Sequence, residues 1–226
     1  MDNFKNPYID KLIGPHIENK DSKINWHEYI INNIEIIGGE KINNFEIVKT
    51  KVDIDIISYV ESQVDKMLES YGRSKVIALP LNNIHLLNSG GTEMYTKGRL
   101  SHAAHSSLQQ SIIVDRDISN IQFSLQLFHE MVHVKSYTAF QIISENKNIE
   151  QLQNYRNGLR VVSRDGKTVY LGNLEEAVVA YLTNQFYESA IKESSVYSYE
   201  MEKLNQGKLE FYISRQEELT QLEIFN

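Results

Sequence analysis

The sequence predicts an α+β fold, with an N-terminal lobe made of a helix and a twisted sheet, a long helix that carries polar side chains, and a mainly helical C-terminal lobe. Apolar residues recur at steps of three and four in several segments, which is typical of amphipathic helices, and short runs rich in β-branched residues separate them. The chain has 226 residues, 41% of them hydrophobic, which suffices for one buried core. We therefore expect a single domain over residues 1–226, with lobes of about 1–143 and 144–226.

The N-terminal lobe is predicted from one helical and three strand-like segments. Over residues 55–71 the apolar side chains fall mostly on one helical face, so this helix should pack on a sheet. Short β-rich runs follow at 76–79, where Pro80 stops the run, and at 84–87, and a third ends at 111–114. Three or four strands are therefore expected before the next helix.

A long helix is predicted over residues 121–143, because this segment contains neither glycine nor proline. Asp117, Ser119 or Asn120 can cap its N-terminus with a side-chain oxygen. Its apolar residues form two stripes with a narrow polar sector between them. The residues of this sector are Gln122, Gln126, His129, Glu130, His133 and Tyr137. A largely buried helix with one polar sector is what a metal site on the floor of a cleft requires.

The C-terminal lobe begins with a polar stretch and a predicted hairpin. Two β-rich runs flank the pair Asp165-Gly166, which is typical of a hairpin turn. A helix is expected to open at Gly172 and to run through Phe186, and the tail from Tyr199 onward is expected to form one or two helices broken near Gly207.

The run His129-Glu130-Met131-Val132-His133 carries the predicted chemistry. Residues four apart in an α-helix project from one face, so His129 and His133 can place two imidazole nitrogens on one metal ion. Glu130 would lie beside the ion, where its carboxylate can take a proton from a metal-bound water and later deliver it to a leaving amine. The spacing therefore predicts two zinc ligands and a general base.

A third ligand is needed, because a catalytic zinc ion usually has three protein ligands and a water. The chain has no cysteine, and no histidine follows His133. The third donor is therefore an acidic residue downstream, or one of the upstream histidines His85, His102 and His105.

The motif on the long helix, together with Leu174-Glu175-Glu176-Ala177 at the opening of a second helix, resembles the gluzincin group of zincin metallopeptidases over roughly residues 120–187. In that group, which includes thermolysin and the zinc aminopeptidases, the second helix typically carries Asn-Glu followed by a small residue. The resemblance implies a zincin-like fold and Glu176 as the third zinc ligand. It also implies that Ala177 is the small residue that lets the two helices approach closely.

Glu175 is the alternative third ligand. In helical projection it lies within the apolar stripe of its helix, where a carboxylate needs a reason to be buried. The resemblance favours Glu176, because the small residue and the Tyr181-Leu182 continuation fall into register together. Both glutamates would also suit the positive end of a helix dipole without any metal. Thermolysin-like enzymes often carry, at the position of Ala180, an Asp that supports a ligand histidine, so here this support must come from elsewhere.

Two weaker sets of residues are candidates for contacts with substrate. His102 and His105 lie in residues 100–114, and the strand in that place commonly lines the cleft of zincins, so either could bind substrate or a stabilised oxyanion. The mechanism also needs a hydrogen-bond donor facing the developing charge. The candidate donors are Tyr137, Tyr155, Tyr170 and Tyr197.

The composition argues against several other classes of protein. The absence of cysteine excludes disulfide frameworks, thiolate metal sites and thiol nucleophiles. A formal net charge of -7 without a Lys/Arg cluster argues against nucleic acid as a partner. No apolar segment approaches the length of a membrane span and the N-terminus has no apolar signal region, so we expect a cytoplasmic protein without a membrane partner.

The function expected from these residues is that of a zinc-dependent metallopeptidase acting on a peptide or protein substrate. A Zn²⁺ ion held by His129, His133 and Glu176 would activate a water for attack on the peptide carbonyl, with Glu130 as general base and then acid. One rival is a catalytically inactive zincin-like module that uses the metal for stability or partner binding. Another is a metal-free scaffold in which the motif is accidental. The sequence leaves the oligomeric state open.

Overall fold

The computed structural model of the protein describes residues 9–13, 42, 45–73, 78–98, 102–107, 110–116, 119–146 and 149–206. Within these ranges the structure is mixed, with two sheets and five α-helices. The helices are α2 (Lys51–Ser70), α3 (Gly91–Thr96), α4 (Asn120–Lys135), α5 (Gly172–Phe186) and α6 (Ser198–Asn205). The strands are β1 (Lys11–Ile13), β2 (Ile84–Leu87), β3 (Ala103–Ser106), β4 (Ser111–Asp115), β5 (Thr138–Asn146), β6 (Ile149–Asn157), β7 (Arg160–Val162) and β8 (Val169–Tyr170).

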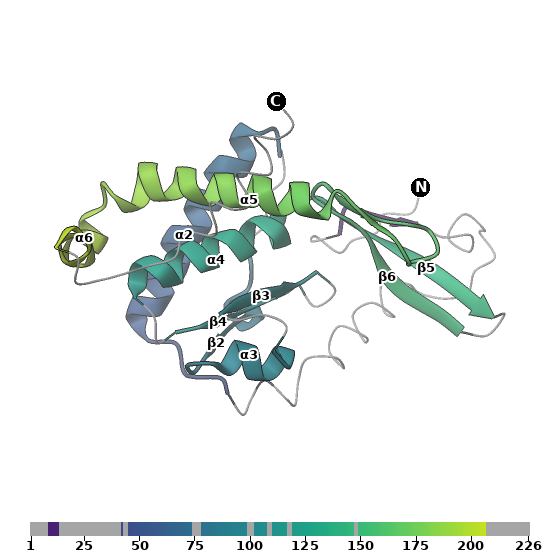
Figure 1. Ribbon diagram of the computed structural model, residues 1–226, viewed down its shortest axis with the longest axis horizontal. Helices are drawn as coiled ribbons and strands as arrows, with labels where there is room; N and C mark the ends of the chain where they lie inside the picture. Colours follow the sequence, from purple (N-terminus) through teal and green to yellow (C-terminus); the bar gives the residue numbers. More distant parts are fainter. Residues whose placement is uncertain are drawn as a thin grey trace.

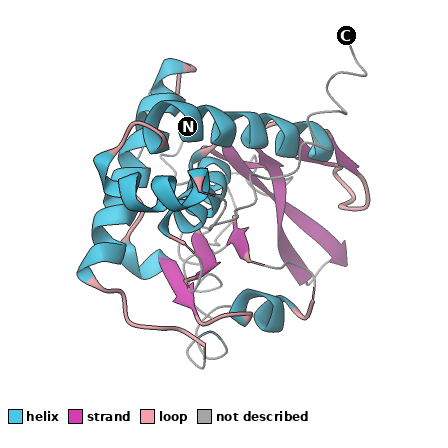
Figure 2. Ribbon diagram, turned by 60° about the vertical axis from the view of Figure 1, so that its left-hand side comes forward, coloured by secondary structure: helices cyan, strands magenta, loops and turns pink. Residues whose placement is uncertain are grey.

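Helix α4 lies at the centre of the fold, between a small sheet and α5 (Figure 1). The small sheet has the strand order β2-β4-β3, in which β2 runs parallel and β3 antiparallel to β4. Helix α2 also packs against α4, and α3 lies on the opposite side of the small sheet. The second sheet, with the order β1-β5-β6-β7-β8, extends to one side of the helices (Figure 2).

The N-terminus of α4 is capped twice, which explains why the helix begins where it does. The Ser119 side chain accepts a hydrogen bond from the Gln122 N–H at 3.0 Å, so the predicted Ser119 cap is confirmed. The carboxylate of Glu200, from α6, accepts the N–H groups of Asn120 and Ile121, each at 3.0 Å. A carboxylate at this end of a helix also interacts favourably with the helix dipole.

The polar sector predicted for this helix is present. Apolar side chains on the other faces are fully buried, among them Phe123, Phe128 and Met131, whereas His129 and Glu130 are half-buried. One turn further along, His133 is buried. The helix is therefore largely enclosed, and the side chains of its predicted polar sector are less buried than its apolar ones, except for His133.

The prediction of a helix through residue 143 is wrong beyond Lys135. The Ser136 hydroxyl donates to the Val132 carbonyl at 2.6 Å, and the chain continues as β5. This strand pairs in parallel with β1 and antiparallel with β6. The segment 138–143 contains β-branched and aromatic residues, which favour a strand. Pairing with strands on both sides stabilises this strand more than the local helix propensity, which neither glycine nor proline lowers, would stabilise a helix. The following stretch, which we expected to be mainly helical, therefore also contains strands β6, β7 and β8.

Helix α2 begins four residues earlier than predicted because Thr50 and Asp53 form a capping box. Asp53 is buried and also accepts a hydrogen bond from Arg116 Nε at 2.5 Å. Burial raises the pKa of the Asp53 carboxyl, but the hydrogen bonds from Thr50 and Arg116 outweigh this effect and hold the pKa below its usual range. The carboxylate thus joins the start of α2 to the segment that leads into α4.

The other predicted elements have mixed outcomes. Strands β2 and β4 are confirmed, as are the hairpin across Asp165-Gly166 and the start of α5 at Gly172. Of the strand predicted at 76–79, residues 76 and 77 lie outside the described residues, and Leu79 is not in a strand. Asp117 and the chain from residue 207 onward also lie outside them. Among the helices that the structure describes, none is long and apolar enough to cross a membrane.

Candidate metal centre

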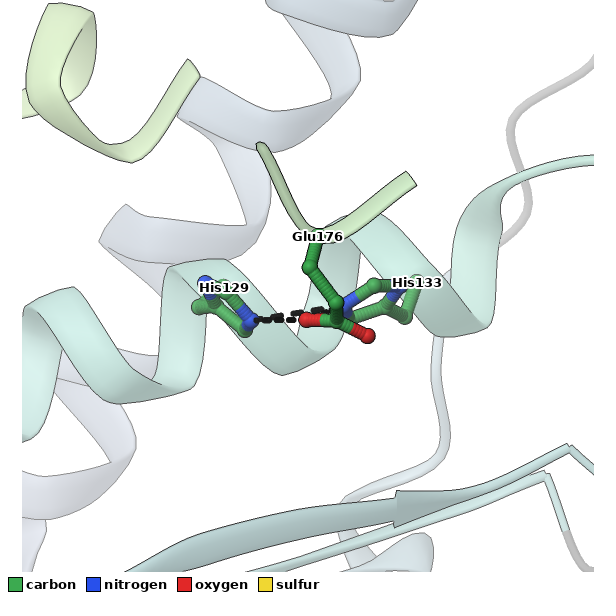
Figure 3. A group of neighbouring side chains, drawn as sticks. All are labelled: His129, His133 and Glu176. Atoms are coloured by element: carbon green, nitrogen blue, oxygen red, sulfur yellow. Dashed lines mark hydrogen bonds and ion pairs between the residues drawn. The ribbon is translucent and has the colours of Figure 1, made fainter. Parts of the chain in front are cut away.

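Helices α4 and α5 pack closely because the residues between them are flat or small. The rings of Phe128 and Phe186 stack with centroids 4.3 Å apart and an interplanar angle of 5°. Ala177 and Ala180 of α5 are both buried. The first turn of α5 is thereby brought to the His129–His133 face of α4, as the close-up shows (Figure 3).

Three donor atoms from the two helices converge at this contact. His133 Nε2 lies 3.3 Å from His129 Nε2, and Glu176 Oε2 lies 3.3 Å from His133 Nε2 and 3.4 Å from His129 Nε2 (Figure 3). A tetrahedral zinc ion with bonds of about 2.0–2.1 Å has ligand-to-ligand separations of roughly 3.3–3.4 Å. The three atoms are thus spaced like one face of such a tetrahedron, so the residues fit the ion that the sequence predicts.

The electrostatics of this cluster favour positive charge. Burial lowers the pKa of the His133 imidazole, but the hydrogen bonds to Glu175 and Glu176 outweigh burial and raise the pKa to about 10. Partial burial raises the pKa of the Glu176 carboxyl, but hydrogen bonds from His129 and His133 outweigh it and hold this pKa well below its usual range. The carboxylates thus create a negative potential at the point where the three donors meet, which is where a cation would bind.

Glu175 lies on the other side of the His133 ring from these converging atoms. Its Oε1 is 3.4 Å from His133 Nδ1, and its Oε2 accepts the Leu159 N–H at 2.6 Å. The Glu175 side chain is only 5% exposed, and these two contacts are the reason why a carboxylate is buried in the apolar stripe of α5. Of the two glutamates that the sequence left open, Glu176 is the one that joins the three-donor cluster.

Glu130 has a partner that the sequence did not predict. Its Oε2 lies 2.7 Å from His105 Nδ1, and its side chain is 12% exposed. Burial raises the pKa of the Glu130 carboxyl, but the hydrogen bond from His105 and the charges of the nearby histidines outweigh burial and hold the pKa below its usual range. Glu130 is therefore held as a carboxylate beside the three-donor cluster.

Strand β3 directs His105 toward α4. Along this strand Ala104 packs with Ile113 and Leu87 on one face of the small sheet, whereas Ala103 packs against the core on the α4 face. Side chains alternate along a strand, so His105 shares the face of Ala103. The His105 ring also stacks on the His133 ring, with centroids 4.6 Å apart.

The opposite nitrogen of His105 is also engaged. Asn157 Nδ2 lies 3.5 Å from His105 Nε2 and donates to Ser107 Oγ at 2.6 Å. Nδ1 of His105 thus faces Glu130, and its Nε2 faces the amide of Asn157. Both nitrogens of His105 have protein partners, Glu130 and Asn157, and a contact of His105 with substrate or an oxyanion stays a prediction.

The other candidate histidines do not join the cluster. His85, on β2, lies 3.0 Å from Glu46 through its Nδ1. The side chain of His102 is 58% exposed, and its Nδ1 lies 3.9 Å from Asp115. Neither histidine is placed to serve as the third ligand.

The four candidate tyrosines are dispersed. Tyr197 is buried in the core and shares a hydrogen bond of 2.8 Å with Ser124, and burial raises the pKa of its hydroxyl to about 12. Tyr170 is exposed, and arginine guanidinium groups lie over the rings of Tyr137 and Tyr155. Tyr197 is thus excluded by its position, and an oxyanion donor among the other three remains a prediction.

Two signals for the missed contacts were present in the sequence. The alternation of Ala103 and His105 along a strand preceding the motif helix would have put His105 on the helix-facing side. The pair Asn157-Gly158 is a strong hairpin signal, and the turn it forms contacts Glu175.

No protein-family model matches the chain, and no curated protein or solved structure matches it. The function must therefore be inferred from the residues of the site and their geometry.

Proposed function

We propose that this chain is a zinc metallopeptidase of the gluzincin kind, with a zincin-like fold, in which His129, His133 and Glu176 hold Zn²⁺. The observation that carries the proposal is the convergence of one oxygen and two imidazole nitrogens, each pair 3.3–3.4 Å apart, from two helices. A nitrogen-rich set with one carboxylate suits zinc better than magnesium or calcium, which prefer oxygen ligands.

The chemistry then divides between the ion and the residues of the chain. A zinc ion bound there would act as a Lewis acid and lower the pKa of a water for attack on a peptide carbonyl. Glu130 accepts the proton of the attacking water and passes it to the leaving amine. The hydrogen bond from His105 to Glu130 Oε2 keeps the carboxylate in a fixed orientation for this transfer.

The position of β3 favours a peptide as the substrate. This strand is at the edge of the small sheet and packs against α4, and in the described part of the chain no strand pairs with its outer side. An extended peptide can add to such an edge through backbone hydrogen bonds. A peptide bound along β3 near His105 would pass beside Glu130, since His105 contacts that carboxylate.

The test combines metal analysis with hydrolysis of a library of fluorogenic peptides. Purified wild-type protein should contain one zinc per chain, and an anomalous-scattering map should show the ion at His129, His133 and Glu176. Glu130→Gln should keep the zinc and the fold but lower peptide hydrolysis by at least about 10²-fold. Glu46→Gln, which alters a carboxylate paired with a histidine elsewhere in the fold, is the matched control.

Two results would count against the proposal. Full activity of Glu130→Gln would exclude Glu130 as the general base. Stoichiometric zinc without hydrolysis of any library peptide would favour the catalytically inactive module instead.

A further inference from the structure

We propose that Glu175 is a positioning residue for the metal ligand His133, and that the β6–β7 turn holds Glu175 in place through Gly158 and Leu159. The inference deepens the proposed function and rests on His133 being a zinc ligand. Glu175, which directly precedes the third ligand Glu176, would support His133, and the β6–β7 hairpin of the second sheet would hold Glu175.

The two nitrogens of His133 face different partners. Nε2 belongs to the three-donor cluster, whereas Nδ1 lies 3.4 Å from Glu175 Oε1. An imidazole that binds a metal through Nε2 carries its proton on Nδ1 and donates it to an acceptor. A carboxylate in this place fixes the tautomer and the ring orientation and makes the ligating nitrogen more basic.

The turn between β6 and β7 holds the Glu175 carboxylate through Oε2, the oxygen that does not face His133. Asn157 pairs with Arg160 across the two strands, so Gly158 and Leu159 form the loop. Leu159 N–H donates to Glu175 Oε2 at 2.6 Å, and Gly158 N–H donates to the Tyr137 carbonyl at 2.8 Å. The loop is thereby tied to the end of the α4 segment while one of its N–H groups binds the carboxylate.

Gly158 is the position where this arrangement permits no side chain. A Cβ atom there would lie 2.1 Å from Glu175 Oε1 and 2.6 Å from both Cδ and Oε2. The residue also has a φ of +56°, a backbone conformation that glycine adopts without cost. The absence of a Cβ at residue 158 therefore leaves the space in which the Glu175 carboxylate reaches His133.

The burial of Glu175 would be costly without a function for the carboxylate. Its side chain is 5% exposed, and the His133 ring that it contacts also interacts with two further carboxylates, those of Glu130 and Glu176. The contact with His133 and the hydrogen bond from the Leu159 N–H compensate the cost of burying the Glu175 carboxylate. A metal ion on the far side of the His133 ring would bring further positive charge near the Glu175 carboxylate.

The experiment measures zinc affinity by competition with a chromophoric chelator, which requires no substrate. Glu175→Gln removes the negative charge and leaves one acceptor oxygen for two donors, His133 Nδ1–H and Leu159 N–H, so it should raise the dissociation constant for zinc about 10- to 100-fold. Gly158→Ala should weaken zinc binding in the same direction, because its Cβ displaces the carboxylate. The unfolding midpoint of each metal-free variant separates loss of affinity from loss of the fold.

The chain offers a matched control for each variant. Gly166→Ala introduces a Cβ at another turn glycine with positive φ, where it would meet the side chain of Gln153 and not the metal site. Glu46→Gln alters a different glutamate–histidine pair. Both controls should bind zinc as the wild type does.

The possible outcomes separate this inference from the proposed function. Wild-type zinc affinity in Glu175→Gln would overturn the positioning role while leaving the metal centre intact. Loss of zinc as complete as in His129→Ala would also overturn it, because Glu175 would then be a ligand. Failure of the wild-type protein to bind zinc would overturn the proposed function itself.

Discussion

Zinc binding should stabilise the folded chain, because its proposed ligands come from two helices that are distant in sequence. His129 and His133 lie on α4, and Glu176 lies in the first turn of α5. An ion that binds only the folded form adds about 2.7 kcal/mol of stability when its free concentration is 100 times its dissociation constant. For a chain of this length each kcal/mol raises the unfolding midpoint by roughly 2–4 °C, so the expected rise is about 5–11 °C.

The packing of the two helices does not depend on the ion. Phe128 and Phe186 are almost fully buried at the contact between α4 and α5, and their rings stack. Burying one such side chain contributes about 1.5–3 kcal/mol. The metal-free protein should therefore remain folded and unfold cooperatively at the lower temperature.

The assay is thermal unfolding followed by circular dichroism, first in chelator and then with increasing zinc. Glu176→Ala should abolish the zinc-dependent rise at little cost to the metal-free fold, because the Glu176 side chain is 46% exposed. Glu188→Ala, which removes an exposed carboxylate paired with Lys192 further along the chain, should leave the rise unchanged. The reasoning is refuted if wild type and Glu176→Ala respond equally to zinc. Unfolding of the metal-free protein at room temperature would instead favour a metal used for stability.

Three further outcomes are expected. His105→Ala should lower kcat for peptide hydrolysis about 10-fold or more without changing the zinc content, because it removes the contact with the general base. His105→Asn keeps a donor near the position of Nδ1 and should recover part of the loss, whereas His102→Ala should have no effect. Equal activity of all three variants would contradict this role of His105. Asp53→Asn should lower the free energy of unfolding by about 1–3 kcal/mol at pH 7, measured with urea, because it breaks the pair with Arg116. The pKa of Asp53 is lowered in the folded protein, so its contribution to the free energy of unfolding is complete above the ordinary carboxyl pKa and is lost as the pH falls through the folded value. The difference in free energy of unfolding between Asp53→Asn and wild type should therefore shrink toward pH 3. A difference that does not depend on pH would count against the Asp53 carboxylate as its source. Phe186→Ala should cost about 3–5 kcal/mol of stability and also weaken zinc binding, which a chelator competition on the folded fraction would reveal or refute.

Elements with a local signal could be predicted from the sequence. Ser119 caps α4, Asp165-Gly166 turns the β7–β8 hairpin and α5 begins at Gly172, because each depends on side chains or backbone freedom within a few residues. The positions of His129 and His133 on one helical face follow in the same way from their spacing.

The errors concern pairings between distant parts of the chain. Residues 138–143 are compatible with a helix by local pattern, and they form a strand because β1 and β6 lie on either side of them. Strand β1 is more than a hundred residues earlier in the chain, and no local pattern in β5 reports its presence. For the same reason the sequence left the third ligand open between Glu175 and Glu176, since the choice depends on which glutamate faces the histidines across the contact between α4 and α5.

The surroundings of the motif argue against an accidental occurrence more strongly than the motif does. Three contacts from different elements meet at α4: β3 brings His105 to Glu130, α5 brings Glu176 to both histidines, and the β6–β7 turn holds the carboxylate that faces His133. A metal-free scaffold has no need to bury a carboxylate beside a glycine whose Cβ would collide with it, or to gather three acidic side chains around two histidines. A bound cation gives a common reason for all three contacts, because it compensates the negative charge and requires the histidines to be oriented. Loss of zinc binding in Glu175→Gln and Gly158→Ala, with retention in Gly166→Ala, would therefore support the centre as a whole, and not only one of its contacts.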